Sequence, residues 1–185
     1  MQHLETALIR LTVWLEQRNV PYMVIGGFAV MVWGEPRLTQ DLDVTIWVTA
    51  DRMDQTVRDL TQEFPTEVSD PIAFIQSVRV LPVTVGAIRA DVIFANLPYE
   101  EQAIKRALRI ELPSGGVFVC APEDLILHKI ISTRAKDRQD IEGIFKTRHA
   151  SLDYSYLDPR VRELSDMLAD PAIFDWYDSL RIRWP

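Results

Sequence analysis

The sequence predicts an α+β protein in which a mixed sheet is flanked by helices, with a small helical portion at the C-terminus. Some stretches repeat apolar residues at helical spacing, whereas others are short apolar runs bounded by glycine or proline. The two kinds of stretch do not alternate strictly, which disfavours a doubly wound parallel sheet. A hydrophobic content of 48% in 185 residues supports a packed core rather than a disordered chain.

The first half of the chain opens with leucines spaced by three or four residues, which predict an amphipathic helix. Asn19 and Pro21 end this helix, and Gly34 and Pro36 end the second one. The predicted elements of this half are helix 4–18, strand 22–25, helix 28–33, strand 44–48 and helix 51–62.

The second half continues with two strands joined by a turn at Val85-Gly86, and with a hairpin around Pro113-Ser114-Gly115-Gly116. The predicted elements are strands 74–83 and 88–94, helix 99–108, strands 109–112 and 117–120, helices 122–133 and 137–147, and one or two tail helices broken at Asp170-Pro171. We expect a core over residues 1–121 and a helical portion over 122–185 packed on it.

The most informative motif joins two glycines to two aspartates. Gly26 and Gly27 end an apolar strand, and Asp41 and Asp43 follow fourteen residues later at the head of another. Side chains at i and i+2 of a strand share a face, so both carboxylates can aim at one point. Such carboxylates repel unless a cation lies between them, and hard oxygen ligands suit Mg²⁺. Glycine N–H groups at a helix start suit a phosphate, so the motif predicts a site for a metal-bound nucleoside triphosphate.

Each half of this motif also has an ordinary explanation. A lone Gly-Gly is usually a turn, and a lone Asp-x-Asp is usually a solvated strand end. The combination at this spacing, with Arg37 and Thr39 just ahead of the acids, favours the functional interpretation.

The segment Ile25-Gly26-Gly27 with Asp41-Leu42-Asp43 resembles the signature of the polymerase-beta-like nucleotidyltransferase superfamily. The resemblance implies a nucleotidyltransferase-like sheet and a third carboxylate on a later apolar strand. Asp91 is the only carboxylate in the run Ile88 to Phe94 and fits that place. Asp41, Asp43 and Asp91 are therefore the expected catalytic and metal-binding residues, with Gly26 and Gly27 holding the triphosphate.

A second segment, from Pro122 to Lys129 and from Arg134 to Ile141, looks like the helical region of the AbiEii-type toxin branch. That resemblance implies that a helix lysine and a Lys-Asp-x-x-Asp segment complete the nucleotide site. Arg37, Thr39 and Lys129 are the weaker candidates for phosphate contacts. Lys129 can instead be an ordinary snorkelling lysine, and Asp137 can pair with Lys129 or Lys136, or cap the following helix.

Composition excludes several other classes of protein. A net charge of −7 argues against general coating of nucleic acid, although six basic residues between 129 and 148 leave a local basic face open. The single cysteine, Cys120, forms no intrachain disulfide, and the three scattered histidines form no zinc pattern. There is no Walker loop. No signal peptide or membrane-spanning stretch is recognised, so we expect a cytoplasmic protein without membrane contact.

The expected activity is Mg²⁺-dependent transfer of an NMP from an NTP such as ATP to an acceptor. The resemblance implies the toxin of a toxin–antitoxin pair, acting on tRNA or protein and paired with an antitoxin. A small-molecule acceptor of the aminoglycoside type is the alternative within this class. A non-catalytic module that binds nucleotide without transferring it is the alternative outside it.

Overall fold

The computed structural model describes residues 2–184 and divides the chain into two compact units. The first comprises Met1–Phe28 and Leu38–Cys120, and the second comprises Ala29–Arg37 and Ala121–Pro185. The sequence places the boundary after residue 121, but it does not foresee that Ala29–Arg37 joins the second unit. The helix α2 (Gly26–Trp33) therefore begins in the first unit, while most of its length belongs to the second.

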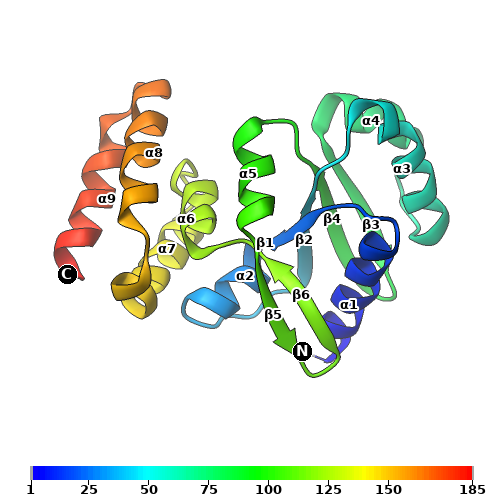
Figure 1. The fold of residues 1–185 in the computed structure, drawn as a ribbon, viewed down its shortest axis with the longest axis horizontal. Coiled ribbons are helices and arrows are strands. Elements are labelled where there is room, and N and C mark those ends of the chain that lie inside the picture. The colour runs from blue at the N-terminus through cyan, green and yellow to red at the C-terminus, as the bar shows by residue number, and fades with distance from the viewer. Residues whose placement is uncertain (1, 185) are drawn as a thin grey trace. The chain divides into compact units, whose positions relative to one another are not determined.

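The first unit is built on one mixed sheet with the order β3-β4-β2-β1-β6-β5 (Figure 1). Strands β1 and β6 pair in parallel, as do β2 and β4, whereas the other neighbours are antiparallel. The strands are β1 (Tyr22–Ile25), β2 (Asp41–Ile46), β3 (Val80–Val85), β4 (Ile88–Phe94), β5 (Leu108–Leu112) and β6 (Gly115–Val119). This mixed sheet with flanking helices confirms the α+β prediction.

One face of the sheet carries the core of the first unit. Leu42, Val44 and Ile46 alternate along β2 with the acids and are fully buried, and β4 shows the same alternation. The helix α1 (Gln2–Gln17) covers this face with the leucines that the helical spacing predicts, among them Leu8 and Leu11. Burial of each such side chain stabilises the fold by about 1.5–3 kcal/mol.

The other helices of this unit are α3 (Ala50–Glu63), α4 (Pro71–Val78) and α5 (Pro98–Arg106). The prediction of a strand over 74–83 is wrong in its first half, because α4 occupies that stretch and β3 starts at Val80. Asp70 caps α4 by accepting a hydrogen bond from the backbone N–H of Ala73 at 3.1 Å, and Pro71 occupies the first turn. Both residues favour a helix start over an apolar strand.

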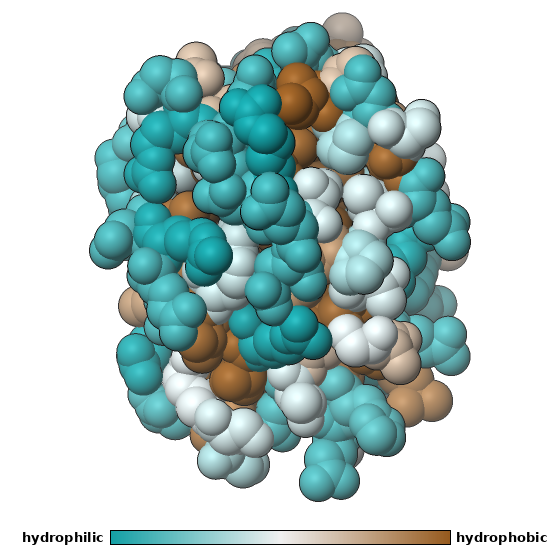
Figure 2. All heavy atoms as spheres, turned by 90° about the vertical axis from the view of Figure 1, so that its right-hand side faces the viewer, coloured by the Kyte–Doolittle hydropathy of each residue, from teal (hydrophilic) through white to brown (hydrophobic). Residues whose placement is uncertain are grey.

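The side of the molecule that bears α1, α3 and α4 in Figure 1 has a hydrophilic surface. In the view of Figure 2, hydrophobic residues form small separate spots among hydrophilic ones. Scattered spots of this kind are usual on a protein surface.

The second unit is helical, as the sequence predicts for the C-terminal portion. It contains α6 (Pro122–Ile130), α7 (Ala135–Arg148), a 3-10 turn (His149–Ser151), α8 (Tyr154–Met167) and α9 (Pro171–Arg183). Asp170 caps α9 by accepting a hydrogen bond from the N–H of Ala172, so the predicted break lies where the sequence places it. The aromatic rings of Phe145 and Tyr177 meet edge to face at 5.9 Å in the core, and Figure 1 shows α8 and α9 side by side.

The segment Ala29–Arg37 packs closely on α7. Thr147 Oγ1 donates a hydrogen bond to the carbonyl of Trp33 at 2.6 Å. A Cβ on Gly143 would lie 3.1 Å from the backbone nitrogen of Glu35. These contacts explain why this segment belongs to the helical unit. Among residues 2–184, no helix is both long and apolar enough to span a membrane.

Candidate functional site

The two glycines lie where β1 gives way to α2. Gly26 has a φ of +63°, a conformation that favours glycine. A Cβ built on Gly26 would lie 1.8 Å from Asp43 Oδ2 and 2.6 Å from its Cγ. The absence of a side chain at Gly26 therefore provides the space that the Asp43 carboxylate occupies. The predicted link between the glycines and the aspartates is thus a direct contact.

The three candidate acids lie on one face of neighbouring strands. Asp43 of β2 is the register partner of Asp91 of β4, and Asp41 is the partner of Arg89. Register partners in paired strands project to the same side, and strands lie about 4.8 Å apart. Asp41, Asp43 and Asp91 therefore share the sheet face opposite the buried side chains of Leu42 and its neighbours.

Asp41 and Asp91 have side-chain partners close to them in sequence. Thr39 Oγ1 donates a hydrogen bond to Asp41 Oδ1 at 2.9 Å. The Nε and an Nη of Arg89 both lie 3.1 Å from Asp91 Oδ1. Arg89 is not among the residues predicted for the site, although its i, i+2 spacing from Asp91 on a strand predicts a shared face. The Arg89 side chain is 67% exposed, so it can turn away from Asp91 into solvent.

The donor set fits a hard divalent cation. Asp43 and Asp91 sit opposite each other on adjacent strands, Asp41 is two residues from Asp43, and the glycine gap makes room for one of their carboxylates. Such oxygens match the ligands that Mg²⁺ takes. Within residues 2–184, no cluster of three or more His, Cys, Asp or Glu side chains already converges as a metal site. Closing these carboxylates around an ion requires Asp91 to turn away from Arg89.

The remaining two candidates, Arg37 and Lys129, belong to the second unit. Arg37 makes two hydrogen bonds to the carboxylate of Asp140, from Nε at 2.7 Å and from Nη2 at 3.0 Å. Lys129 Nζ lies 2.9 Å from Asp140 and 2.6 Å from Asp137. Lys129 is 8% exposed, so it is not a snorkelling surface lysine. Both cations are held in a buried ion-pair network.

Asp137 pairs with Lys129. It does not cap α7, because Arg134 occupies the cap position of that helix. Burial raises the pKa of Asp137, but hydrogen bonds from Lys129, Ser132 and Arg134 outweigh burial and hold this pKa at about 2. Burial also raises the pKa of Asp140, and hydrogen bonds from Arg37 and Lys129 lower it below its usual value. Both carboxylates are thus ionised at neutral pH.

The basic residues near α7 do not form one face. At 100° per residue, Lys136 lies about 160° around the helix from Arg138. Arg138 stacks over the ring of Trp176 at 5.1 Å, and Arg148 over that of Trp33 at 5.4 Å. Lys146 forms an ion pair with Glu35.

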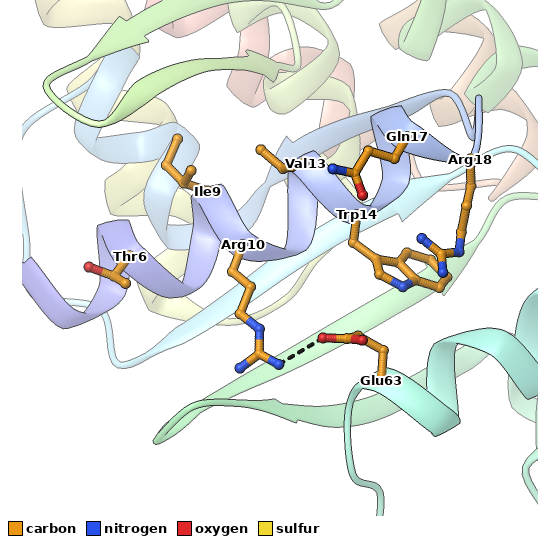
Figure 3. A pocket seen from close by; sticks show the side chains of 8 residues that line it. All are labelled: Thr6, Ile9, Arg10, Val13, Trp14, Gln17, Arg18 and Glu63. Carbon is orange, nitrogen blue, oxygen red and sulfur yellow. Dashed lines mark hydrogen bonds and ion pairs between the residues drawn. The ribbon is translucent and has the colours of Figure 1, made fainter.

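The first unit also has an open hollow of about 520 Å³ between α1 and the end of α3 (Figure 3). Ile9 and Val13 line it beside Trp14, and an ion pair of 2.8 Å joins Arg10 to Glu63 across it. None of the eight candidate site residues lines this hollow. It lies along the helix that covers the buried face of the sheet, so the acids and the hollow are separate features.

Comparison with protein families decides the general class of the chain. Residues 6–185 match the family described as "Nucleotidyltransferase of unknown function (DUF6036)". The chain belongs to this nucleotidyltransferase family. It is accordingly an enzyme of the phosphorus-transferring class, as the glycine and aspartate motif predicts. A search of curated proteins finds no match.

Solved structures support the same fold at low sequence identity. An antigenic nucleotidyltransferase-like protein from Paracoccidioides brasiliensis aligns with a TM-score of 0.56 and 20% identity, over 91% of this chain and 90% of its own. The antibiotic-resistance factor ANT(2'')-Ia aligns with a TM-score of 0.56 and 16% identity, over 91% and 95%. The lincosamide antibiotic adenylyltransferase LnuA aligns with 0.53 and 16%, over 76% and 95%. This nucleotidyltransferase family thus shares its fold with these proteins.

Proposed function

We propose that this nucleotidyltransferase moves an NMP from an NTP to an acceptor in a Mg²⁺-dependent reaction. The observation that carries the proposal is the Gly26 gap filled by the Asp43 carboxylate, opposite Asp91 on the next strand. This arrangement joins a backbone suited to phosphate with carboxylates suited to a cation.

Each residue of the first unit has a role in this proposal. Asp41 and Asp43 hold the Mg²⁺ that accompanies the triphosphate, and the N–H groups of Gly26 and Gly27 contact the phosphates. Bound Mg²⁺ supplies charge neutralisation on the phosphate oxygens. Asp91 completes the cation site or accepts the proton of the acceptor hydroxyl as a general base. The acceptor oxygen bonds to the α-phosphorus as the bond to the pyrophosphate oxygen breaks.

Arg37 and Lys129 are expected to contact phosphate, but both form ion pairs within the second unit. Their charges are already balanced by Asp140 and Asp137. We propose that this ion-pair network chiefly stabilises the second unit, and that Arg37 and Lys129 contact phosphate only when one of these ion pairs opens. Lys129→Met should then destabilise the fold as well as affect nucleotide binding.

For the acceptor, we propose tRNA or protein, as in the AbiEii-type toxin branch, with an antitoxin as partner. The support is the helical segment that contains Lys129, Asp137 and Asp140, which resembles that branch in sequence. Expression should then arrest host growth, and Asp41→Asn with Asp43→Asn should remove the arrest. Growth unaffected by the wild-type chain would argue against a toxin.

A small-molecule acceptor is the second candidate. Two proteins that share the fold are named for antibiotic resistance and for adenylyl transfer to lincosamides. The experiment that separates the candidates is transfer from α-labelled NTPs into a cell lysate, with the labelled product divided into RNA, protein and small-molecule fractions. A non-catalytic module predicts NTP binding with no label in any fraction.

If the label enters tRNA, charge reversal at Arg138 and Arg148 tests whether basic residues of α7 contact it. The proposal expects weaker tRNA binding with unchanged NTP affinity, and a steep loss of binding between roughly 50 and 200 mM salt. Both side chains stack on tryptophans, so a melting curve of the variant is the necessary control. Indifference to both salt and charge reversal would remove α7 from the tRNA contact surface.

A further inference from the structure

The two edge strands of the sheet, β3 and β5, differ in how well their outward backbone groups are covered. At the β3 edge, Pro82 lacks a backbone donor, and the segment before α4 covers the strand. The N–H of Thr84 donates to the carbonyl of Pro65 at 2.8 Å, and Thr66 Oγ1 donates to the carbonyl of Pro82 at 2.7 Å. These contacts protect the β3 edge from pairing with another strand.

The β5 edge has no such cover. The N–H groups of Phe118 and Cys120 point from β6 toward β1, to Tyr22 Oη at 3.3 Å and to the carbonyl of Val24 at 3.0 Å. Backbone groups alternate in direction along a strand, so the odd-numbered residues of β6 face β5. Their register partners are Leu108, Ile110 and Leu112.

The intervening residues, Arg109 and Glu111, therefore turn their N–H and C=O groups outward. Within residues 2–184, no backbone hydrogen bond reaches them on that side. Their side chains are also accessible, with 54% of Arg109 and 71% of Glu111 exposed. Leu108 adds an apolar side chain that is 46% exposed.

We propose that this edge is a docking surface for a second copy of the chain, which adds its own β5 in antiparallel orientation. The strand reads Leu-Arg-Ile-Glu-Leu, and this pattern is complementary to itself about Ile110. A two-fold axis there places Arg109 opposite Glu111 of the second copy, and Glu111 opposite its Arg109. The two pairs exchange four backbone hydrogen bonds.

Side chains on both sides of the strand fit this pairing. Arg109 and Glu111 already form an ion pair of 2.7 Å within one chain. In the dimer each of these side chains also faces the opposite charge on the second copy, so four charges alternate in sign across the two strands. On the other side, Leu108 of each copy meets Leu112 of the other. Because a five-residue strand buries little area, the dimer belongs to the weak class of interfaces, below about 1,200 Å².

The decisive experiment uses two opposite charge reversals in the full-length chain. Arg109→Glu and Glu111→Arg each break the pair within a chain, and each places like charges across the two-fold axis. Sedimentation velocity from about 10 µM to 1 mM, a range suited to weak association, should show a wild-type dimer and two monomeric variants. An equimolar mixture of the variants should form a 1:1 dimer, because opposite charges then face each other again.

A backbone variant tests the hydrogen bonds once the loss of the Glu111 charge is measured in a matched variant, Glu111→Ala. Glu111→Pro removes an outward donor in each copy without touching the hydrogen bonds to β6, and it should weaken association roughly 5- to 150-fold beyond Glu111→Ala, the range for two hydrogen bonds. Circular dichroism should show that all variants fold. A wild-type chain that stays monomeric at 1 mM, variants that dimerise as the wild type does, or a mixture that stays monomeric beside a dimeric wild type would each overturn the proposal.

Discussion

The Gly26→Ala substitution tests the contact on which the site depends. Gly26 has a φ of +63°, and an added Cβ would lie 1.8 Å from Asp43 Oδ2. Two effects should follow, namely backbone strain and displacement of the Asp43 carboxylate. Gly86 offers a matched control, because its φ is +66° and a Cβ there would meet nothing within 4 Å. Gly86→Ala therefore carries the strain without the displacement.

The expected magnitudes differ between the two variants. Left-handed backbone costs a residue with a side chain roughly 1–2 kcal/mol. Gly86→Ala should lower the melting temperature accordingly, by about 2–4 °C for each kcal/mol in a chain of this size. Gly26→Ala should lose about 0.5–1.5 kcal/mol more as Asp43 leaves its rotamer. A catalytic group displaced by about 1 Å can cost on the order of 10²-fold in rate.

Two assays separate these effects. Thermal melting measures the loss of stability in each variant, and Mg²⁺-dependent binding of NTP measures the site. We expect Gly86→Ala to bind NTP as the wild type does and Gly26→Ala to bind it weakly. If the two variants lose equal stability and Gly26→Ala retains binding and transfer, Asp43 does not depend on the glycine gap.

Further predictions concern the acids of both units. Asp41→Asn with Asp43→Asn should melt no lower than the wild type, because neutralising neighbouring carboxylates relieves repulsion; a marked drop in melting temperature would assign the pair a structural role. Asp91→Asn should reduce turnover on the order of 10²–10⁴-fold if Asp91 is the general base, with little change in NTP affinity; equal losses in both would make it a ligand of the nucleotide-bound metal. The free energy of unfolding, from urea melts, should fall as pH drops from about 3.8 toward 2, because the pKa of Asp137 is about 2 in the folded state. Asp137→Asn should reduce that fall, whereas an identical pH profile would show that Lys129 does not stabilise the carboxylate.

Local patterns in the sequence were sufficient for most elements and for the acidic face. The i, i+2 spacing of Asp41 and Asp43 places both on one side of β2, and the structure starts the strand at Asp41 rather than at residue 44. The strand prediction for the segment before β3 is wrong because the apolar pair Phe74 and Ile75 suits a helix as well as a strand, and Asp70 with its following proline starts a helix there.

The ion-pair partners that are far apart in the chain could not be predicted from the sequence. Asp140 binds Arg37 from 103 positions away, and it also binds Lys129, so two cations expected at a phosphate are held by a carboxylate. No spacing rule covers that distance. The contact of Gly26 with Asp43 also depends on the register of β1 with β2, which pairs Ile25 with Asp43. The motif predicted proximity, and the register explains it.

Isothermal titration of each NTP into the chain, with Mg²⁺ and with EDTA, measures whether nucleotide binding depends on the metal. We expect binding that requires Mg²⁺ and disappears when Asp41 and Asp43 are both changed to Asn. NTP binding of equal strength in EDTA, or in the double variant, would contradict the claim that these carboxylates hold a metal-bound nucleotide.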